Sequence, residues 1–139
     1  MVLYLASDLL WATRIKSCAD DLTPPVPARP VRNLEMLEVR LADSPVKGVL
    51  LDLAAGDEGH EGEMAFSMLA RLRAGKPGED LGNIKVVAFG PHVLAQQLAG
   101  AKKAGANVVM ARGALAANLP RVLRELEGGG MELRDQLTD

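Results

Sequence analysis

The chain has 139 residues, a formal net charge of −2, 48% hydrophobic residues and 24% charged residues, as in an ordinary globular domain with one core. Aromatic side chains make up only 3%, which argues against a surface that stacks bases, and the charge argues against direct binding of nucleic acid or an anionic membrane. The single cysteine, Cys18, cannot form an internal disulfide. With no signal-peptide pattern and no apolar run long enough for a membrane span, the sequence predicts a cytoplasmic protein.

The run Lys47-Gly-Val-Leu-Leu-Asp-Leu-Ala54 organises the chain. A short continuous apolar run of this kind is typical of a strand buried on both faces, as in the centre of a parallel sheet. A charge inside a sheet is costly unless it is paired. Asp52 is therefore expected where the strand emerges, at the carboxyl edge where open α/β sheets hold their sites.

Short apolar runs alternate with helix-like segments along the whole chain. The expected strands are about residues 2–6, 28–32, 46–53, 84–89 and 107–111. The expected helices, indicated by caps and by apolar residues three or four positions apart, are about residues 8–19, 33–44, 64–74, 92–104 and 114–126. Trp11 and Cys18 share the apolar face of the first helix and are expected to pack in the core, and Pro30 indicates an edge strand.

This alternation predicts a three-layer α/β sandwich of the flavodoxin-like type. Each connection between strands is long enough for a helix, so the five-stranded sheet should be parallel and covered by helices on both faces. Right-handed crossovers favour the strand order 2-1-3-4-5. The glycines at 128–130 are expected to end the folded part, and residues 131–139 are left open as a frayed tail, a short helix or a linker.

Motifs of familiar enzyme chemistry are missing. The sequence contains no glycine-rich phosphate loop and no G-x-S-x-G nucleophile motif. His60 and His92 lie far apart, and neither has a cysteine or a second histidine at ligand spacing. The sequence therefore predicts a protein that is not an enzyme, with no cofactor and no metal.

Three segments resemble the receiver domain of bacterial two-component response regulators. They are Val49-Leu-Leu-Asp-Leu53, Ile84-Lys-Val-Val-Ala-Phe89 and Ala104-Gly-Ala-Asn-Val-Val-Met-Ala-Arg112. The resemblance covers about residues 1–127, which it makes one receiver-like domain followed by a glycine-rich break and tail at 128–139. It implies that Asp52 stands at the position of the aspartate that accepts a phosphoryl group.

Other positions depart from the pattern of that family. The two acidic residues that help to hold magnesium after the first strand correspond to Ala6 and Ser7, with Asp8 one step later. The hydroxyl residue after the fourth strand corresponds to Gly90, and the lysine after the fifth strand to Arg112. Magnesium needs hard oxygen ligands, and without it the charge on a transferring phosphoryl group is poorly neutralised. These departures predict a degenerate receiver, or pseudo-receiver.

Two compensations are conceivable at this edge. Asp57 and Glu58, with Glu61 and Glu63, crowd the loop after the central strand and are weak candidates for a cation site with Asp52, although a solvated acidic loop is the favoured interpretation. Alternatively, Asp52 pairs with Arg112 as a fixed internal mimic of part of a phosphorylated site.

The leading interpretation is a receiver-like signal-transduction module that acts through protein contacts. Its partner, or a second copy, is expected on segments 92–104, 107–111 and 114–126, the face that receiver-like domains use. One alternative is a working receiver that is phosphorylated on Asp52 with Mg²⁺. Another is a flavodoxin-like binding protein or enzyme with a small ligand near Gly56, Gly90 and Gly113.

Overall fold

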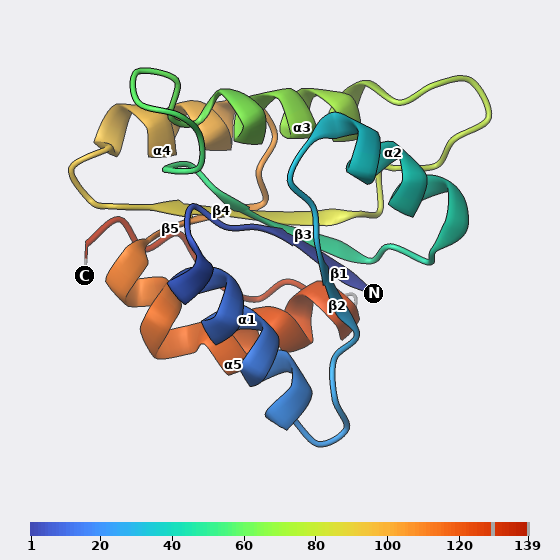
Figure 1. Cartoon of the computed structure of the whole chain (residues 1–139), viewed down its shortest axis with the longest axis horizontal. Helices are drawn as coiled ribbons and strands as arrows, with labels where there is room; N and C mark the ends of the chain where they lie inside the picture. Colours follow the sequence, from blue (N-terminus) through green and yellow to red (C-terminus); the bar gives the residue numbers. More distant parts are fainter. Residues whose placement is uncertain (129, 139) are drawn as a thin grey trace.

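The computed structural model describes residues 1–128 and 130–138, and within them five strands and five helices alternate along the chain (Figure 1). The strands are β1 (Val2–Leu5), β2 (Ala28–Pro30), β3 (Gly48–Asp52), β4 (Lys85–Gly90) and β5 (Val108–Ala111). The helices are α1 (Leu9–Asp21), α2 (Leu34–Asp43), α3 (Glu63–Ala74), α4 (Ala95–Lys103) and α5 (Arg112–Gly128). In this part of the chain no helix combines the length and apolar character that a membrane span requires.

The strands form one parallel sheet in the order β2-β1-β3-β4-β5, as the sequence predicts. Helices α1 and α5 lie on one face of the sheet, and α2, α3 and α4 lie on the other (Figure 1). The short strand that ends at Pro30 is an edge strand, where a residue without an N–H group does least harm to the ladder. All carboxyl ends of the strands consequently meet at one edge.

The core has two halves because side chains of a strand alternate between the faces of the sheet. Leu50, Phe89 and Met110 pack with apolar residues of α1 and α5. Val49, Leu51 and Val86 pack with apolar residues of α2, α3 and α4. Burial on both faces explains why the central strands are continuous apolar runs.

Local signals set where two helices begin and how closely a third approaches the sheet. The side chains of Asp8 and Asn33 accept hydrogen bonds from the third residue after each, at 2.9 and 2.8 Å, and cap α1 and α2. At Gly48 in β3, an added Cβ would lie 2.6 Å from the Leu126 Cβ. Glycine is therefore required there for α5 to pack against β3.

The boundaries of helices α4 and α5 differ from those expected. Helix α4 begins at Ala95 and not at His92, because Pro91 to Leu94 form a turn closed by the bond from the Leu94 N–H to the Pro91 carbonyl at 2.9 Å. Helix α5 begins directly after β5, at Arg112 and not at residue 114, and it continues to Gly128 through Pro120.

The C-terminal segment (residues 131–138) is neither a frayed tail nor a helix. It lies beside β5, where Gln136 forms a parallel bridge with Met110, and Leu133 is buried against α5 and its neighbours in the core. The prediction that packing ends at the glycines was therefore wrong. Gly129, in the middle of that run, and Asp139 lie outside the described residues.

Candidate functional site

Residues far apart in the sequence meet at the carboxyl edge of the sheet. Asp52 is the last residue of β3, Gly90 is the last residue of β4, and Arg112 follows β5 directly. Ser7 follows β1, the neighbour of β3. The parallel register thus brings together the positions that the sequence singles out.

Asp52 is a fully buried carboxylate, with an exposed fraction of 0%. Its Oδ2 accepts a hydrogen bond from the Ser7 N–H at 2.8 Å, and its Oδ1 accepts one from the Ala54 N–H at 2.9 Å. Hydrogen bonds to both oxygens offset much of the cost of burying this group. Each carboxylate oxygen therefore has a backbone N–H partner within the protein.

Arg112 faces the same carboxylate at longer range. Its Nη2 lies 4.0 Å from the Asp52 Oδ1, and its side chain is 35% exposed. This separation is an ion-pair distance and is too long for a hydrogen bond. The two residues that were expected to pair are thus brought face to face, with the charges attracting but without a direct hydrogen bond.

The Trp11 ring lies beside the Arg112 guanidinium. The Trp11 ring is 6% exposed and packs on Phe89 with ring centroids 5.3 Å apart. The guanidinium carbons of Arg112 and Arg14 lie 5.7 and 5.2 Å from the Trp11 ring centroid, within the range of cation–π attraction. The expected core packing of Trp11 is confirmed, and the ring also orients a site residue.

The acidic loop after β3 does not assemble around Asp52. Asp57 and Glu58 are exposed, while the Glu61 carboxylate accepts from the Gly59 N–H at 3.2 Å and Glu63 lies 3.1 Å from the His60 ring. Among the described residues, no three His, Cys, Asp or Glu side chains are arranged to hold a metal ion. The loop carboxylates are thus engaged locally or solvated.

Comparisons with known proteins bear on the fold. By sequence, the chain matches no protein-family model and no curated protein. By structure, it is similar to the phosphorylated cyanobacterial phytochrome response regulator RcpA, with a TM-score of 0.64 and 16% identity over 94% of this chain and 96% of that one. The chain has a receiver-like fold. Likeness at this identity establishes the architecture and leaves the chemistry to the residues of the site.

The two residues expected at the acid-pair positions, Ala6 and Ser7, carry no carboxylate. Ser7 contributes its backbone N–H to Asp52. The next residue, Asp8, is committed elsewhere, because its Oδ1 accepts from the Trp11 N–H as the cap of α1. Asp52 is the one buried charged residue among those that the structure describes.

Gly90 lacks a hydroxyl although the site has room for a side chain. A Cβ built on Gly90 would lie 3.4 Å from the Leu53 Cβ and 3.8 Å from the Leu94 Cδ1, which are ordinary van der Waals distances. Its φ angle is not positive, so the backbone does not require glycine either. The missing hydroxyl is therefore a property of this sequence and not a steric necessity.

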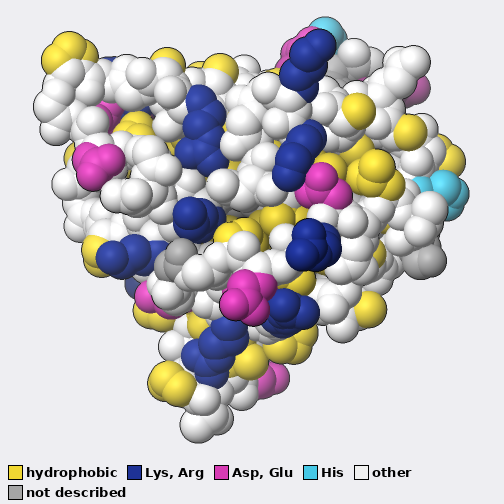
Figure 2. Space-filling view, turned by 180° about the vertical axis from the view of Figure 1, so that it is seen from behind, with side chains coloured by type: hydrophobic (Ala, Val, Ile, Leu, Met, Phe, Trp, Pro, Cys, Tyr) yellow, Lys and Arg dark blue, Asp and Glu magenta, His cyan; other side chains and the backbone are white. Residues whose placement is uncertain are grey.

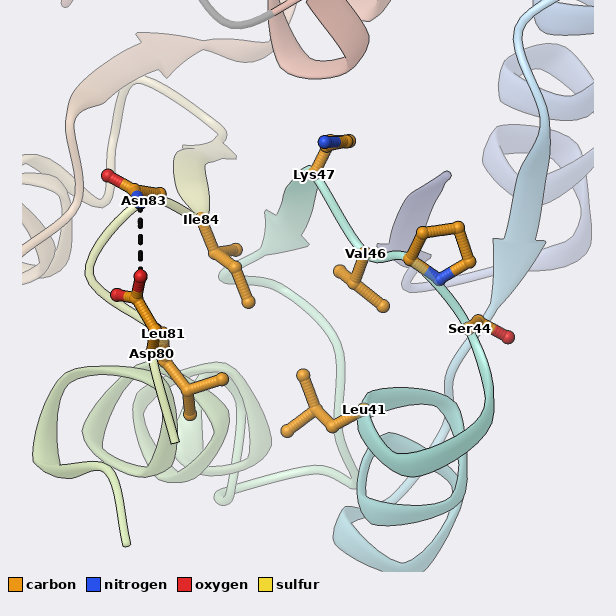
Figure 3. A pocket seen from close by; sticks show the side chains of 9 residues that line it. Leu41, Ser44, Val46, Lys47, Asp80, Leu81, Asn83 and Ile84 are labelled. Atoms are coloured by element: carbon orange, nitrogen blue, oxygen red, sulfur yellow. Dashed lines mark hydrogen bonds between the residues drawn. The ribbon is translucent and has the colours of Figure 1, made fainter. Parts of the chain in front are cut away.

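A pocket of ≈ 340 Å³ lies at the opposite edge of the sheet, between the connections that lead into β3 and β4 (Figure 3). Leu41, Val46 and Ile84 line it together with polar residues, including Asp80 and Asn83, which are joined by a 3.4 Å hydrogen bond. It holds none of the residues Gly56, Gly90 and Gly113 that mark the alternative ligand site.

Sequence reasoning located Asp52 and Arg112 but missed three contributors to the site. The Ser7 and Ala54 backbone donors have no sequence signature, because any residue except proline carries an N–H. Arg14 gave a weak signal, since it stands three positions after Trp11 and such residues are neighbours on a helix surface.

Proposed function

We propose that this receiver-like chain is a signal-transduction module that acts through protein contacts and is not phosphorylated on Asp52 by the usual magnesium-dependent route. The observation that carries the proposal is the full burial of Asp52, whose two oxygens accept hydrogen bonds from the Ser7 and Ala54 N–H groups inside the protein. A phosphodonor could reach this carboxylate only if the surrounding residues moved, because Asp52 is 0% exposed. No catalytic role is assigned to the chain.

The surroundings of Asp52 support the same proposal. A magnesium ion would find one carboxylate, with a methyl group and a hydroxyl at the acid-pair positions, whereas Mg²⁺ is usually bound through carboxylates and phosphate oxygens. Gly90 offers no hydroxyl to a phosphoryl oxygen. Arg112 supplies a fixed positive charge 4.0 Å from Asp52 and in this way mimics part of a charged site without any modification.

For the contact surface, we propose the face formed by α4, β5 and α5. Figure 2 views the molecule from the β5 side. It shows prominent Lys and Arg side chains, with acidic and hydrophobic side chains between them. Exposed basic residues of these elements include Lys102, Lys103 and Arg121. A mixed surface of this kind suits a reversible protein contact, which is polar at its rim.

Treatment with a small phosphodonor tests the proposal. We expect no covalent phosphoryl group on the chain after incubation with acetyl phosphate and Mg²⁺, measured by intact-protein mass spectrometry. The Asp52→Asn variant is the matched control, because it keeps the size of the side chain and removes the nucleophile. A phosphoryl adduct on the unaltered chain that the variant lacks would overturn the proposal in favour of a working receiver.

A further inference from the structure

The C-terminal segment forms backbone hydrogen bonds with the free edge of β5. The Gln136 N–H donates to the Val109 carbonyl at 3.0 Å, and the Gln136 carbonyl accepts from the Ala111 N–H at 2.6 Å. The N–H of Val109 is satisfied by the Asp135 Oδ1 at 3.0 Å. A short piece of the chain thus takes the place of a sixth strand.

The same segment is held from both flanking helices. On the α4 side, the Lys102 Nζ lies 3.2 Å from the Asp135 Oδ1. On the α5 side, the Glu125 Oε1 accepts from the Leu133 N–H at 3.0 Å, and the Leu133 side chain is only 7% exposed. The segment therefore contacts all three elements of the proposed contact face.

Few contacts hold this segment against β5. Met110 and Gln136 form a single bridge, Leu133 is the one buried residue of the segment, and Leu137 is 48% exposed. Segments with few buried apolar contacts open at low free energy.

We infer that the β5 edge is a strand-accepting surface that the C-terminal segment keeps closed in this chain. Once the segment leaves, the backbone groups of Val109 and Ala111 form an unpaired sheet edge, which is a template for an added strand. The inference rests on the proposed function, because it places the regulation of partner binding on the α4, β5 and α5 face.

The seated segment also defines the chemistry of the partner. The edge accepts an extended peptide with a leucine that enters the apolar cluster beside α5, as Leu133 does. Two positions later the peptide carries an aspartate that binds the Val109 N–H and the Lys102 ammonium, as Asp135 does. A partner with this Leu-x-Asp pattern competes directly with the C-terminal segment.

An Asp135→Ala variant of the full chain tests whether the segment is displaceable. We expect amide hydrogen exchange at Ala111, whose N–H bonds to the Gln136 carbonyl, to accelerate about tenfold, since a charge-assisted hydrogen bond that holds the segment is lost. The Leu53 amide, which donates to the Phe89 carbonyl at 2.8 Å, reports the intact sheet and should not change. Glu132→Ala is the control. It removes one negative charge from the same segment, but it keeps the hydrogen bond to Glu125, because the Glu132 backbone N–H donates that bond.

A synthetic peptide with the sequence of residues 130–138 is the binding probe. We expect it to bind Asp135→Ala about tenfold more tightly than the unaltered chain or Glu132→Ala, with amide shifts at β5, measured by NMR titration. Leu133→Ala should act in the same direction as Asp135→Ala. Equal affinity for all variants, no binding to Asp135→Ala, or unchanged exchange at Ala111 would overturn the inference.

Failure of this inference and failure of the proposed function are distinguishable. Peptide binding involves no phosphoryl chemistry, so a chain that opens as expected but is phosphorylated on Asp52 would contradict the proposed function alone. A chain that resists phosphorylation but whose Asp135→Ala variant does not bind the peptide would contradict only the closed β5 edge.

Discussion

Asp52 combines full burial with a charge, and its neighbours explain how the fold tolerates it. The N–H groups of Ser7 and Ala54 bind its two oxygens, while Arg112 lies at 4.0 Å. Such an arrangement ties the loop after β1 to the loop after β3, because one carboxylate accepts from both. The residue is thus a structural acceptor at the carboxyl edge of the sheet.

Removing this carboxylate should destabilise the fold. In Asp52→Ala the N–H groups of Ser7 and Ala54 lose their acceptor, and we expect the free energy of unfolding to fall by about 2–4 kcal/mol. Urea denaturation followed by the fluorescence of Trp11, the single tryptophan, measures the change. Asp57→Ala, in the exposed loop, is the control and should leave the stability near that of the unaltered chain. Equal stability of the two variants would show that Asp52 has no structural role.

At the scale of elements, an arginine joins α2, α3 and the loop after α3. The Arg71 Nε and Nη2 donate to the Glu38 carboxylate at 2.5 and 2.9 Å, and Nη2 also donates to Glu79 at 2.8 Å. These hydrogen bonds lower the pKa of both Glu38 and Glu79 and raise the pKa of Arg71. The Arg71 side chain is 14% exposed, so its guanidinium is largely shielded from water.

This network predicts how stability depends on pH. Because the folded-state pKa of Glu38 and of Glu79 lies below the ordinary value of 4.5, the unfolded chain binds protons first as the pH falls. Their contribution is present above pH 4.5 and is lost as the pH drops through the lowered values. Since both carboxylates are partly exposed, the effect should be modest.

An Arg71→Met variant isolates this contribution. We expect its thermal midpoint to fall less steeply than that of the unaltered chain when the pH is lowered from 4.5. Lys16→Met is the matched control, because it removes an exposed ion pair with Asp20 at 3.1 Å on α1. If the unaltered chain and Arg71→Met lose stability in parallel, the network does not set the acid sensitivity.

At the scale of the whole molecule, the sequence was sufficient for the architecture. The strand around Val49 to Asp52 and the later strand to Phe89 are apolar on both faces, which is typical of a covered parallel sheet. Connections of helix length and a proline near the first edge then favour the order 2-1-3-4-5, which the structure confirms. The pattern of apolar residues predicts the architecture because each strand and helix buries its own apolar face.

Details that depend on single contacts were beyond the sequence. The C-terminal segment was missed because its position rests on the Asp135 carboxylate, the Glu125 carboxylate and one buried leucine, and no periodic pattern records such contacts. The distance between Arg112 and Asp52, and the backbone bonds that close Asp52, likewise depend on how the strands end. Resemblance to receivers could place these residues at one edge but could not give their geometry.

The most direct test of the closed site is a titration of the chain with Mg²⁺, with and without beryllofluoride, followed by amide NMR shifts. Beryllofluoride mimics a phosphoryl group on a receiver aspartate, and it needs both the metal and an available carboxylate oxygen. We expect no shifts at Asp52, Gly90 or Arg112 that require both additions at millimolar metal. Shifts at these residues that appear only when both are present would mean a functioning receiver and would contradict the account.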